Sequence, residues 1–77
     1  MKVKVLLFGV LAEEAGLEEM EIPSVKTVDD LKHSIISRYP AFNKYKFNIS
    51  VNKTLVKGNP ELTDGDEVAL LPPFAGG

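Results

Sequence analysis

The chain has 77 residues, which is the length of one small domain. It contains no cysteine and a single histidine, so disulfides and a self-contained zinc site are excluded, and the fold must rest on apolar packing. The formal net charge of −2, with only one arginine, argues against a nucleic-acid-binding protein.

The first third of the chain predicts two strands joined by a short helical turn. Residues 2–8 begin with alternating polar and apolar side chains, which is typical of a strand, and Gly9 ends it. The apolar run at 5–12 is interrupted by this glycine and is too short to cross a membrane, so we expect a cytoplasmic protein with no membrane association. Residues 10–15 predict a helical turn that ends at a left-handed Gly16. Residues 18–22 alternate again, and Pro23 marks this strand as an edge.

Residues 28–38 form the clearest predicted helix. Thr27 is a favourable N-cap, and Asp30 three residues later resembles a capping box. Arg38 lies in the last turn and Pro40 ends the helix, after which we expect a loop. The apolar stripe that should face the core consists of Val28, Leu31, Ile35 and Tyr39.

The second half of the chain predicts three more strands, at residues 47–51, 54–56 and 67–71. The first two are joined by a two-residue turn at Asn52 and Lys53, and turn-forming pairs at 59–60 and 64–65 precede the last strand. One main helix covering a mixed sheet of four to five strands is the α+β arrangement called β-grasp, in which the first and last strands lie parallel at the centre. We therefore expect a β-grasp domain over residues 1–71 and a C-terminal tail over residues 72–77.

One face of this sheet carries more apolar side chains than a single helix can cover. If Val3, Val5 and Leu7 face the helix, alternation places the neighbouring apolar residues on the opposite face. Exposed contiguous apolar surface usually marks a partner site. The alternatives are that residues 9–15 fold back over Phe8 or that the register differs. The predicted partner interface consists of Leu6, Phe8, Ala69 and Leu71.

The tail is the least ordinary part of the chain. Pro72 and Pro73 lack N–H groups and favour a stiff, extended conformation, so the six tail residues span on the order of 20 Å. Gly76 and Gly77 have no side chains and can enter a narrow channel. The carboxyl group of Gly77 is an unhindered acyl group that ATP could activate as an acyl-adenylate, but the chain has no phosphate-binding loop or nucleophilic group to do this. It would therefore be a substrate and carrier rather than an enzyme. The alternative is a frayed terminus that happens to end in two glycines.

The chain resembles the MoaD-type family of sulfur carriers, the small subunits of molybdopterin synthase, which belong to the ubiquitin-like ThiS/MoaD proteins. The resemblance covers nearly the whole chain and is most specific in the opening strand at 2–8, the run at 64–69 and the ending Pro72-Pro73-Phe74-Ala75-Gly76-Gly77. Lys53 stands where the family commonly has glycine, which should alter the turn type.

The resemblance implies a cycle of activation and sulfur transfer. A MoeB-type enzyme would use ATP to adenylate Gly77, and a sulfur donor would convert it to a thiocarboxylate. The tail would enter a MoaE-type large subunit, which supplies the catalytic residues, and sulfur would pass to cyclic pyranopterin monophosphate. Gly77 would carry the sulfur, Gly76 would provide clearance, and Phe74 and Ala75 would complete the inserted segment. No cofactor or metal is expected on the carrier itself.

Several alternatives remain open from the sequence. Related carriers serve thiamine synthesis or tRNA thiolation, ubiquitin-like relatives are conjugated to lysines, and a passive interaction domain belongs to another class altogether. The charges are also segregated, because residues 31–60 contain no acid and all eleven acids lie outside them. Such segregation can steer partner docking, or it can reflect ordinary solvated faces.

Overall fold

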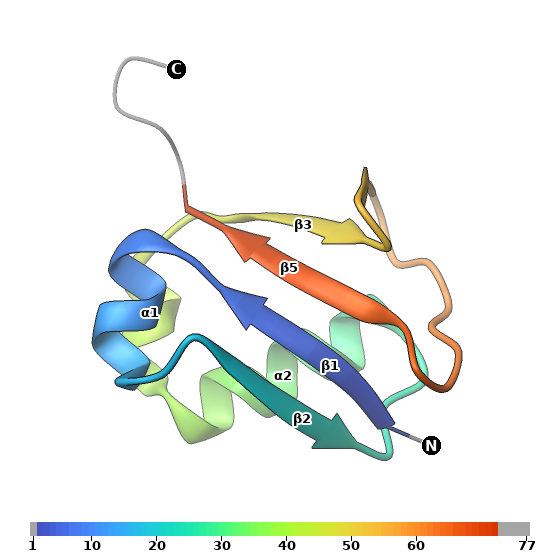
Figure 1. Cartoon of the computed structure of the whole chain (residues 1–77), viewed down its shortest axis with the longest axis horizontal. Helices are drawn as coiled ribbons and strands as arrows, with labels where there is room; N and C mark the ends of the chain where they lie inside the picture. Colours follow the sequence, from blue (N-terminus) through green and yellow to red (C-terminus); the bar gives the residue numbers. More distant parts are fainter. Residues whose placement is uncertain (1, 73–77) are drawn as a thin grey trace.

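The computed structural model describes residues 2–72 of the chain (Figure 1). The predicted strands and the main helix are confirmed, with ends shifted by a residue or two. In chain order the elements are β1 (Lys2–Leu7), α1 (Gly9–Ala15), β2 (Glu19–Pro23), α2 (Val28–Arg38), the 3₁₀-helix η1 (Pro40–Lys44), β3 (Asn48–Val51), β4 (Thr54–Leu55) and β5 (Glu67–Leu71).

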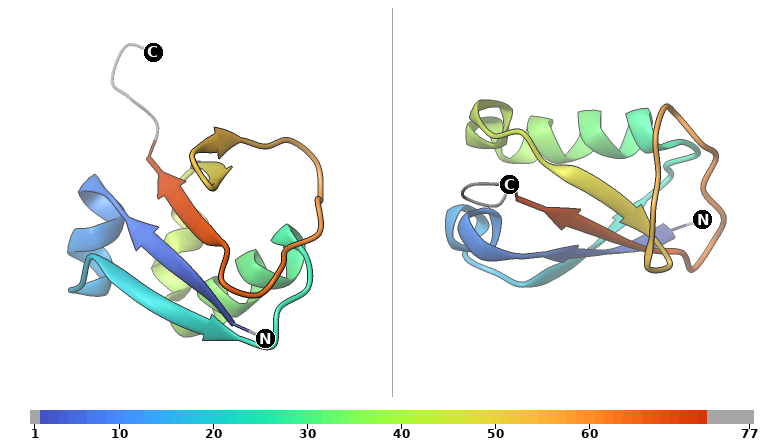
Figure 2. Two further views of the ribbon diagram at one scale, coloured as in Figure 1. Left: turned by 45° about the vertical axis from the view of Figure 1, so that its right-hand side comes forward. Right: turned by 90° about the horizontal axis from the view of Figure 1, so that it is seen from above.

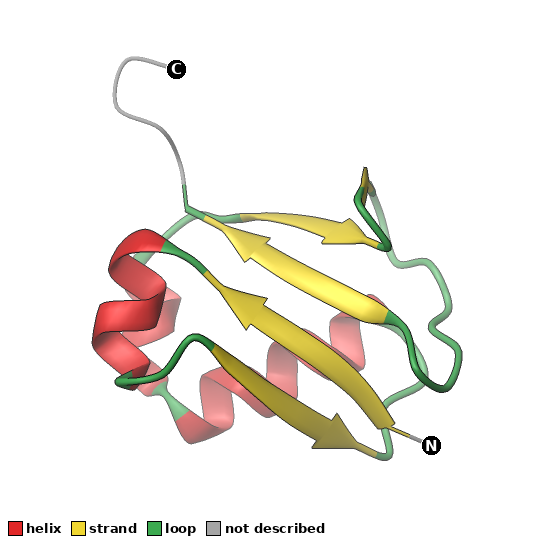
Figure 3. Cartoon of the chain, in the orientation of Figure 1, coloured by secondary structure: helices red, strands yellow, loops and turns green. Residues whose placement is uncertain are grey.

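The strands form one mixed sheet in the order β2-β1-β5-β3-β4. β1 and β5 are parallel neighbours at the centre, and the remaining pairs are antiparallel. Figure 2 shows α2 lying across one face of the sheet, and in Figure 3 both α-helices lie behind or beside the strands and not in front of them. The predicted β-grasp fold is confirmed, and the face opposite α2, called the open face below, is not covered by a helix within residues 2–72.

The core lies between the sheet and α2. In β1 the side chains of Val3, Val5 and Leu7 are buried while those between them are not, so the predicted alternation is confirmed. Burying one such side chain contributes about 1.5–3 kcal/mol. The core residues are Val3, Val5, Leu7, Leu11, Ile22, Val25, Val28, Leu31, Ile35, Phe42, Ile49, Leu62, Val68 and Leu70.

The start of α2 is fixed from both near and distant parts of the chain. The Thr27 hydroxyl accepts a hydrogen bond from the Asp30 N–H at 3.2 Å, as its N-cap role predicts. The Asp30 carboxylate accepts from the Lys26 N–H at 3.2 Å, one residue before the position that a capping box uses. The Asn59 side chain accepts from the Asp29 N–H at 2.7 Å, so the long loop before β5 also caps this helix.

The expectation of a loop after Pro40 is wrong. This proline begins η1, because its fixed φ suits the first turn of a helix and its missing N–H is not needed there. Phe42 in η1 is fully buried, and its ring stacks on that of Tyr39 with centroids 5.4 Å apart. Burial of one aromatic ring therefore gives this short segment a defined structure.

The turn between β3 and β4 is a tight two-residue turn. Asn52 and Lys53 have positive φ values of 49° and 73°, as the type I′ hairpin turn requires. Lys53 therefore takes the backbone conformation that glycine would take, and the expected change of turn type does not occur. A left-handed conformation costs a residue with a side chain about 1–2 kcal/mol.

No helix within residues 2–72 is both long and apolar enough to cross a membrane.

Candidate functional site

The open face of the sheet has one apolar end and one charged edge. Strand pairing places Leu6 directly opposite Ala69, and Leu71 lies two residues further along β5. Phe8 follows β1 in an extended conformation and is 44% exposed. The structure thus brings together the four residues predicted for the partner interface, called the apolar patch below: Leu6, Phe8, Ala69 and Leu71.

The same strand register adds a residue that the sequence analysis did not single out. Ala69 is paired with Ser50, and Ser50 is paired with Leu55, so one row runs across the open face from β1 to β4. Leu55 is 65% exposed, whereas Ser50 is buried. The signal was present, since a two-residue turn at 52–53 requires residue 50 to face residue 55. Leu55 is therefore an exposed apolar residue at the β4 edge of this row, separated from the apolar patch by Ser50.

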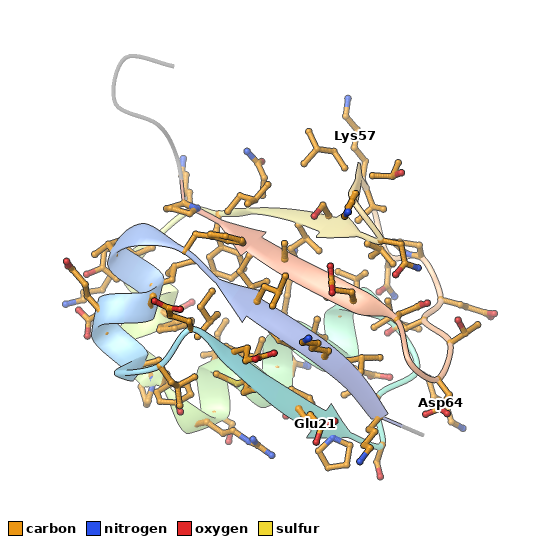
Figure 4. The ribbon with its side chains drawn as sticks, viewed as in Figure 1. Glu21, Lys57 and Asp64 are labelled. Atoms are coloured by element: carbon orange, nitrogen blue, oxygen red, sulfur yellow. The ribbon has the colours of Figure 1, made fainter. Side chains whose placement is uncertain are left out.

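Charged pairs between β1 and β2 run along the β2 edge of the open face, from Glu21 near the end away from the apolar patch to Glu19 opposite Leu6. Lys2 Nζ lies 3.7 Å from a Glu21 carboxylate oxygen, and Lys4 Nζ lies 3.1 Å from one of Glu19. Figure 4 labels Glu21 on β2 at this edge of the sheet. The hydrogen bond and the charge of Glu19 raise the pKa of Lys4 above its ordinary value. Exposed ion pairs of this kind add little folding stability, so their main effect is to keep the β2 edge of the sheet hydrophilic.

The tail leaves the domain at the apolar end. Because β1 and β5 are parallel, both strands end on the same side, next to the apolar patch. Pro72, the first tail residue, is half-buried, and a Cβ atom added to Gly9 would lie 3.1 Å from its Cγ. Gly9 has a positive φ of 56°, a conformation that favours glycine, and this residue follows β1 close to the start of the tail at Pro72. The other predicted tail residues, Phe74, Ala75, Gly76 and Gly77, lie outside the described residues.

Helix α1 leaves the Phe8 side chain 44% exposed, so residues 9–15 do not bury it. The helix stands at the end of the sheet, beside the last residues of β1 (Figure 1). Its Ala12 helps to line a cavity of about 410 Å³ that also contacts Leu6 and Phe8. The apolar patch is therefore open, with a hollow on its α1 side.

The described residues form a surface suited to binding. Within residues 2–72 there is no cluster of three His, Cys, Asp or Glu side chains placed to hold a metal ion. His33, the only histidine, is exposed on α2, away from the apolar patch. The arrangement can hold a partner on its apolar end while the tail extends from the same end.

Comparisons with a family model and with individual proteins point to the same family. A family model described as the ThiS family matches residues 5–77. The chain is 36% identical to the "Molybdopterin synthase sulfur carrier subunit" of Escherichia coli, with 97% of this chain and 99% of that protein covered.

Two solved structures have the same fold over nearly their full length. One is a chain in the complex of subunits 1 and 2 of the molybdopterin-converting factor from Helicobacter pylori, with 30% identity, a TM-score of 0.75 and 100% of both chains covered. The other is small archaeal modifier protein 1 from Methanosarcina acetivorans, with 32% identity, a TM-score of 0.83, and 99% of this chain and 96% of that chain covered. The match of the family model over residues 5–77, together with these relatives, shows that the chain belongs to the ThiS family.

Proposed function

We propose that this chain is the sulfur carrier of molybdopterin synthesis, and that its C-terminal glycine carries the sulfur as a thiocarboxylate. The proposal is supported by the full-length similarity to relatives that are named as sulfur carrier subunits of molybdopterin synthase. The Pro-Pro and Gly-Gly residues of the tail support it as well.

The observation that carries the proposal is the position of the apolar patch at the root of the tail. The patch lies where parallel β1 and β5 end, and Pro72 begins the tail there. A protein that binds the patch therefore lies next to the tail and can receive it. The six residues from Pro72 reach on the order of 20 Å, which is enough to enter a partner's active site.

The chemistry takes place at the Gly77 carboxylate. Its oxygen attacks the α-phosphate of ATP on an activating enzyme, which forms an acyl-adenylate and releases pyrophosphate. A persulfide sulfur of the donor then attacks the acyl carbon and displaces AMP, and a thiol reduces the S–S bond of the resulting acyl disulfide, which releases the thiocarboxylate while the thiol is oxidised to a disulfide with the donor. When the thiocarboxylate sulfur has bonded to cyclic pyranopterin monophosphate, water attacks the acyl carbon, so the sulfur stays on the pterin and the tail returns to a carboxylate. Glycine suits this position because no side chain hinders the acyl carbon.

Two partners use the tail in turn in this cycle. A MoeB-type enzyme supplies the ATP site, and a MoaE-type large subunit supplies the residues that act on the pterin. Both must hold the root of the tail, so both are expected to bind the apolar patch and to exclude each other. We expect the cycle to run in the cytoplasm, where ATP is available to the activating enzyme.

Intact-mass measurement tests the proposal directly. The full chain is incubated with ATP, the activating enzyme and a sulfur source, and its mass should increase by the difference between one sulfur and one oxygen atom. Fragmentation should place this change at Gly77. If neither an adenylate nor a thiocarboxylate forms with any activating enzyme of the source organism, the proposal is wrong.

Deletion of Gly77 provides the matched control. The deleted residue lies six positions beyond the end of β5 and outside the described residues. The shortened chain should therefore unfold at the same denaturant concentration as the full chain but should accept no sulfur. Loss of stability in this variant would mean that the tail contributes to the fold.

A second candidate is a protein modifier that is joined to lysine side chains. It is favoured by the similarity to small archaeal modifier protein 1 from Methanosarcina acetivorans. The two functions share the adenylate and differ in the nucleophile, which is an amine in the second case. Peptides with a Gly-Gly remnant on lysine, found by mass spectrometry in cells and lost when Gly77 is deleted, would support the modifier function.

A further inference from the structure

The hollow on the α1 side of the apolar patch is a candidate site for one particular partner side chain. It has a volume of about 410 Å³, which lies within the range of about 300–1,000 Å³ seen for ligand pockets. It continues directly from the apolar patch, because Leu6 and Phe8 belong to both. Its lining consists of Leu6, Leu7, Phe8, Gly9 and Ala12, with Glu18 and Glu19 at one side.

The two glutamates are held in place by the β1–β2 pairing. The Leu7 N–H donates a hydrogen bond to the Glu18 carbonyl at 2.8 Å, which fixes the backbone at the start of β2. Glu19 lies opposite Leu6 in the strand register. The hollow therefore combines an apolar lining with carboxylate side chains whose backbone is anchored to β1.

The charges around the hollow are predominantly negative. The charged residues that line it are Glu18 and Glu19. Lys4 pairs with Glu19, whereas Glu18 forms no ion pair within residues 2–72. Figure 4 labels Lys57 beyond the β4 end of the sheet, on the side opposite Glu21.

We propose that the hollow receives an arginine side chain from the protein that docks on the apolar patch, and that this arginine pairs with Glu18 and Glu19. Arginine combines an aliphatic stem, which fits the lining from Leu6 and Phe8, with a planar cation that binds carboxylates. The identity of the docking protein rests on the function proposed above, and the MoaE-type large subunit is the partner to test.

The arginine would also orient the tail. Gly9 lines the hollow, and a Cβ atom added to it would lie 3.1 Å from Pro72, so a bound side chain lies near the first residue of the tail. The negative charges of Glu18 and Glu19 would steer a basic side chain of the partner to this corner. Docking on this side therefore aligns the tail with the partner before the tail enters its channel.

Charge reversal at Glu18 tests the pairing, with Glu61 as the matched control. Both glutamates are exposed, and neither forms an ion pair within residues 2–72. The affinity of the full chain for the large subunit is measured by calorimetry at several salt concentrations. Glu18→Lys should weaken binding about tenfold or more at low salt and reduce the salt dependence, whereas Glu61→Lys should change the affinity less than about twofold. An arginine-to-glutamate change on the large subunit should restore binding to Glu18→Lys alone.

Other outcomes would overturn the inference. If Glu18→Lys and Glu61→Lys bind as the wild type does while Phe8→Ala binds weakly, the arginine pairing is wrong and the proposed function stands. If the charge-reversed chain loses affinity but no single arginine of the large subunit restores it, the occupant is not an arginine. Salt-dependent self-association that Glu18→Lys abolishes would make a second copy of this chain the occupant. If the large subunit does not bind and Gly77 accepts no sulfur, both the arginine pairing and the proposed function are wrong.

Discussion

The two faces of the sheet are made from the same strands, but one packs in the core and the other is exposed. On the face toward α2, Val5, Val68 and Leu70 have no exposed surface. On the open face, Leu6, Ala69 and Leu71 alternate with them along the same strands and are only half-buried. Because side chains alternate strictly along a strand, each apolar run in β1 and β5 supplies both a core and a binding surface.

The comparison shows why a domain of this size can afford an exposed apolar surface. One helix and one face of the sheet already enclose a continuous core. The side chains of the other face therefore contribute little to folding stability and can serve binding. Mutations on the two faces should therefore separate stability from binding. Matched substitutions can test this separation.

The largest effect on stability is expected from Phe42→Ala on the covered side. The ring is fully buried, so its removal leaves a cavity and should lower the free energy of unfolding by about 3–5 kcal/mol. Chemical denaturation followed by circular dichroism measures this change. A loss below about 1 kcal/mol would mean that η1 contributes little to the core.

Phe8→Ala is the same chemical change on the open face. Because Phe8 is 44% exposed, the free energy of unfolding should fall by less than about 1 kcal/mol. Binding to the large subunit should weaken about 30-fold, which corresponds to the loss of a central aromatic contact of about 2 kcal/mol. Calorimetry measures the affinity. A variant that binds normally but unfolds easily would reverse the assigned roles of the two faces.

Gly9→Ala tests the border between the open face and the tail. The positive φ should cost alanine about 1–2 kcal/mol of folding stability, and its Cβ would press on Pro72 at 3.1 Å. Gly58→Ala is the control, because Gly58 also has a positive φ but no atom lies within 4 Å of the added Cβ. Both variants should lose similar stability in denaturation curves, and only Gly9→Ala should also weaken partner binding.

The smallest expected effect concerns Asp66, at the end of the sheet away from the tail. Hydrogen bonds from the Thr63 N–H at 2.8 Å, the Asn52 side chain at 3.0 Å and the Thr63 hydroxyl at 2.9 Å lower the pKa of this carboxyl below its ordinary value of 3.8. A lowered pKa in the folded state means that the charged form contributes stability above pH 3.8, and that this contribution is lost as the pH falls through the folded-state value.

Denaturation curves of the wild type and Asp66→Asn at neutral and acid pH measure this contribution. The wild type should be the more stable at neutral pH, and the difference should shrink below pH 3.8. Binding of the large subunit should be the same for both proteins, since Asp66 precedes β5, at the end opposite Leu71. A difference in stability that does not vary with pH would assign the role of Asp66 to side-chain shape rather than charge.

Most of the fold follows from local patterns in the sequence. Alternation in residues 2–8 and 67–71, the Thr27 cap and the stripe of α2 each depend on neighbouring residues, so they are visible without the structure. The same alternation predicted which residues share the open face, and the strand register confirms this for Leu6 and Ala69. Segments whose structure depends on distant partners were harder to predict, as with Phe42 in η1.

The sequence by itself determined the alternating strands, the main helix, the four residues of the apolar patch and the chemical character of the tail. Only the tertiary structure placed Pro72 against Gly9, joined Leu55 to the row across the sheet and formed the hollow between α1, β1 and β2. The physical reason is the separation in sequence between the residues that interact. Alternation and capping arise from neighbours along the chain, whereas a cavity and a contact between residues 9 and 72 exist only after parallel β1 and β5 have paired.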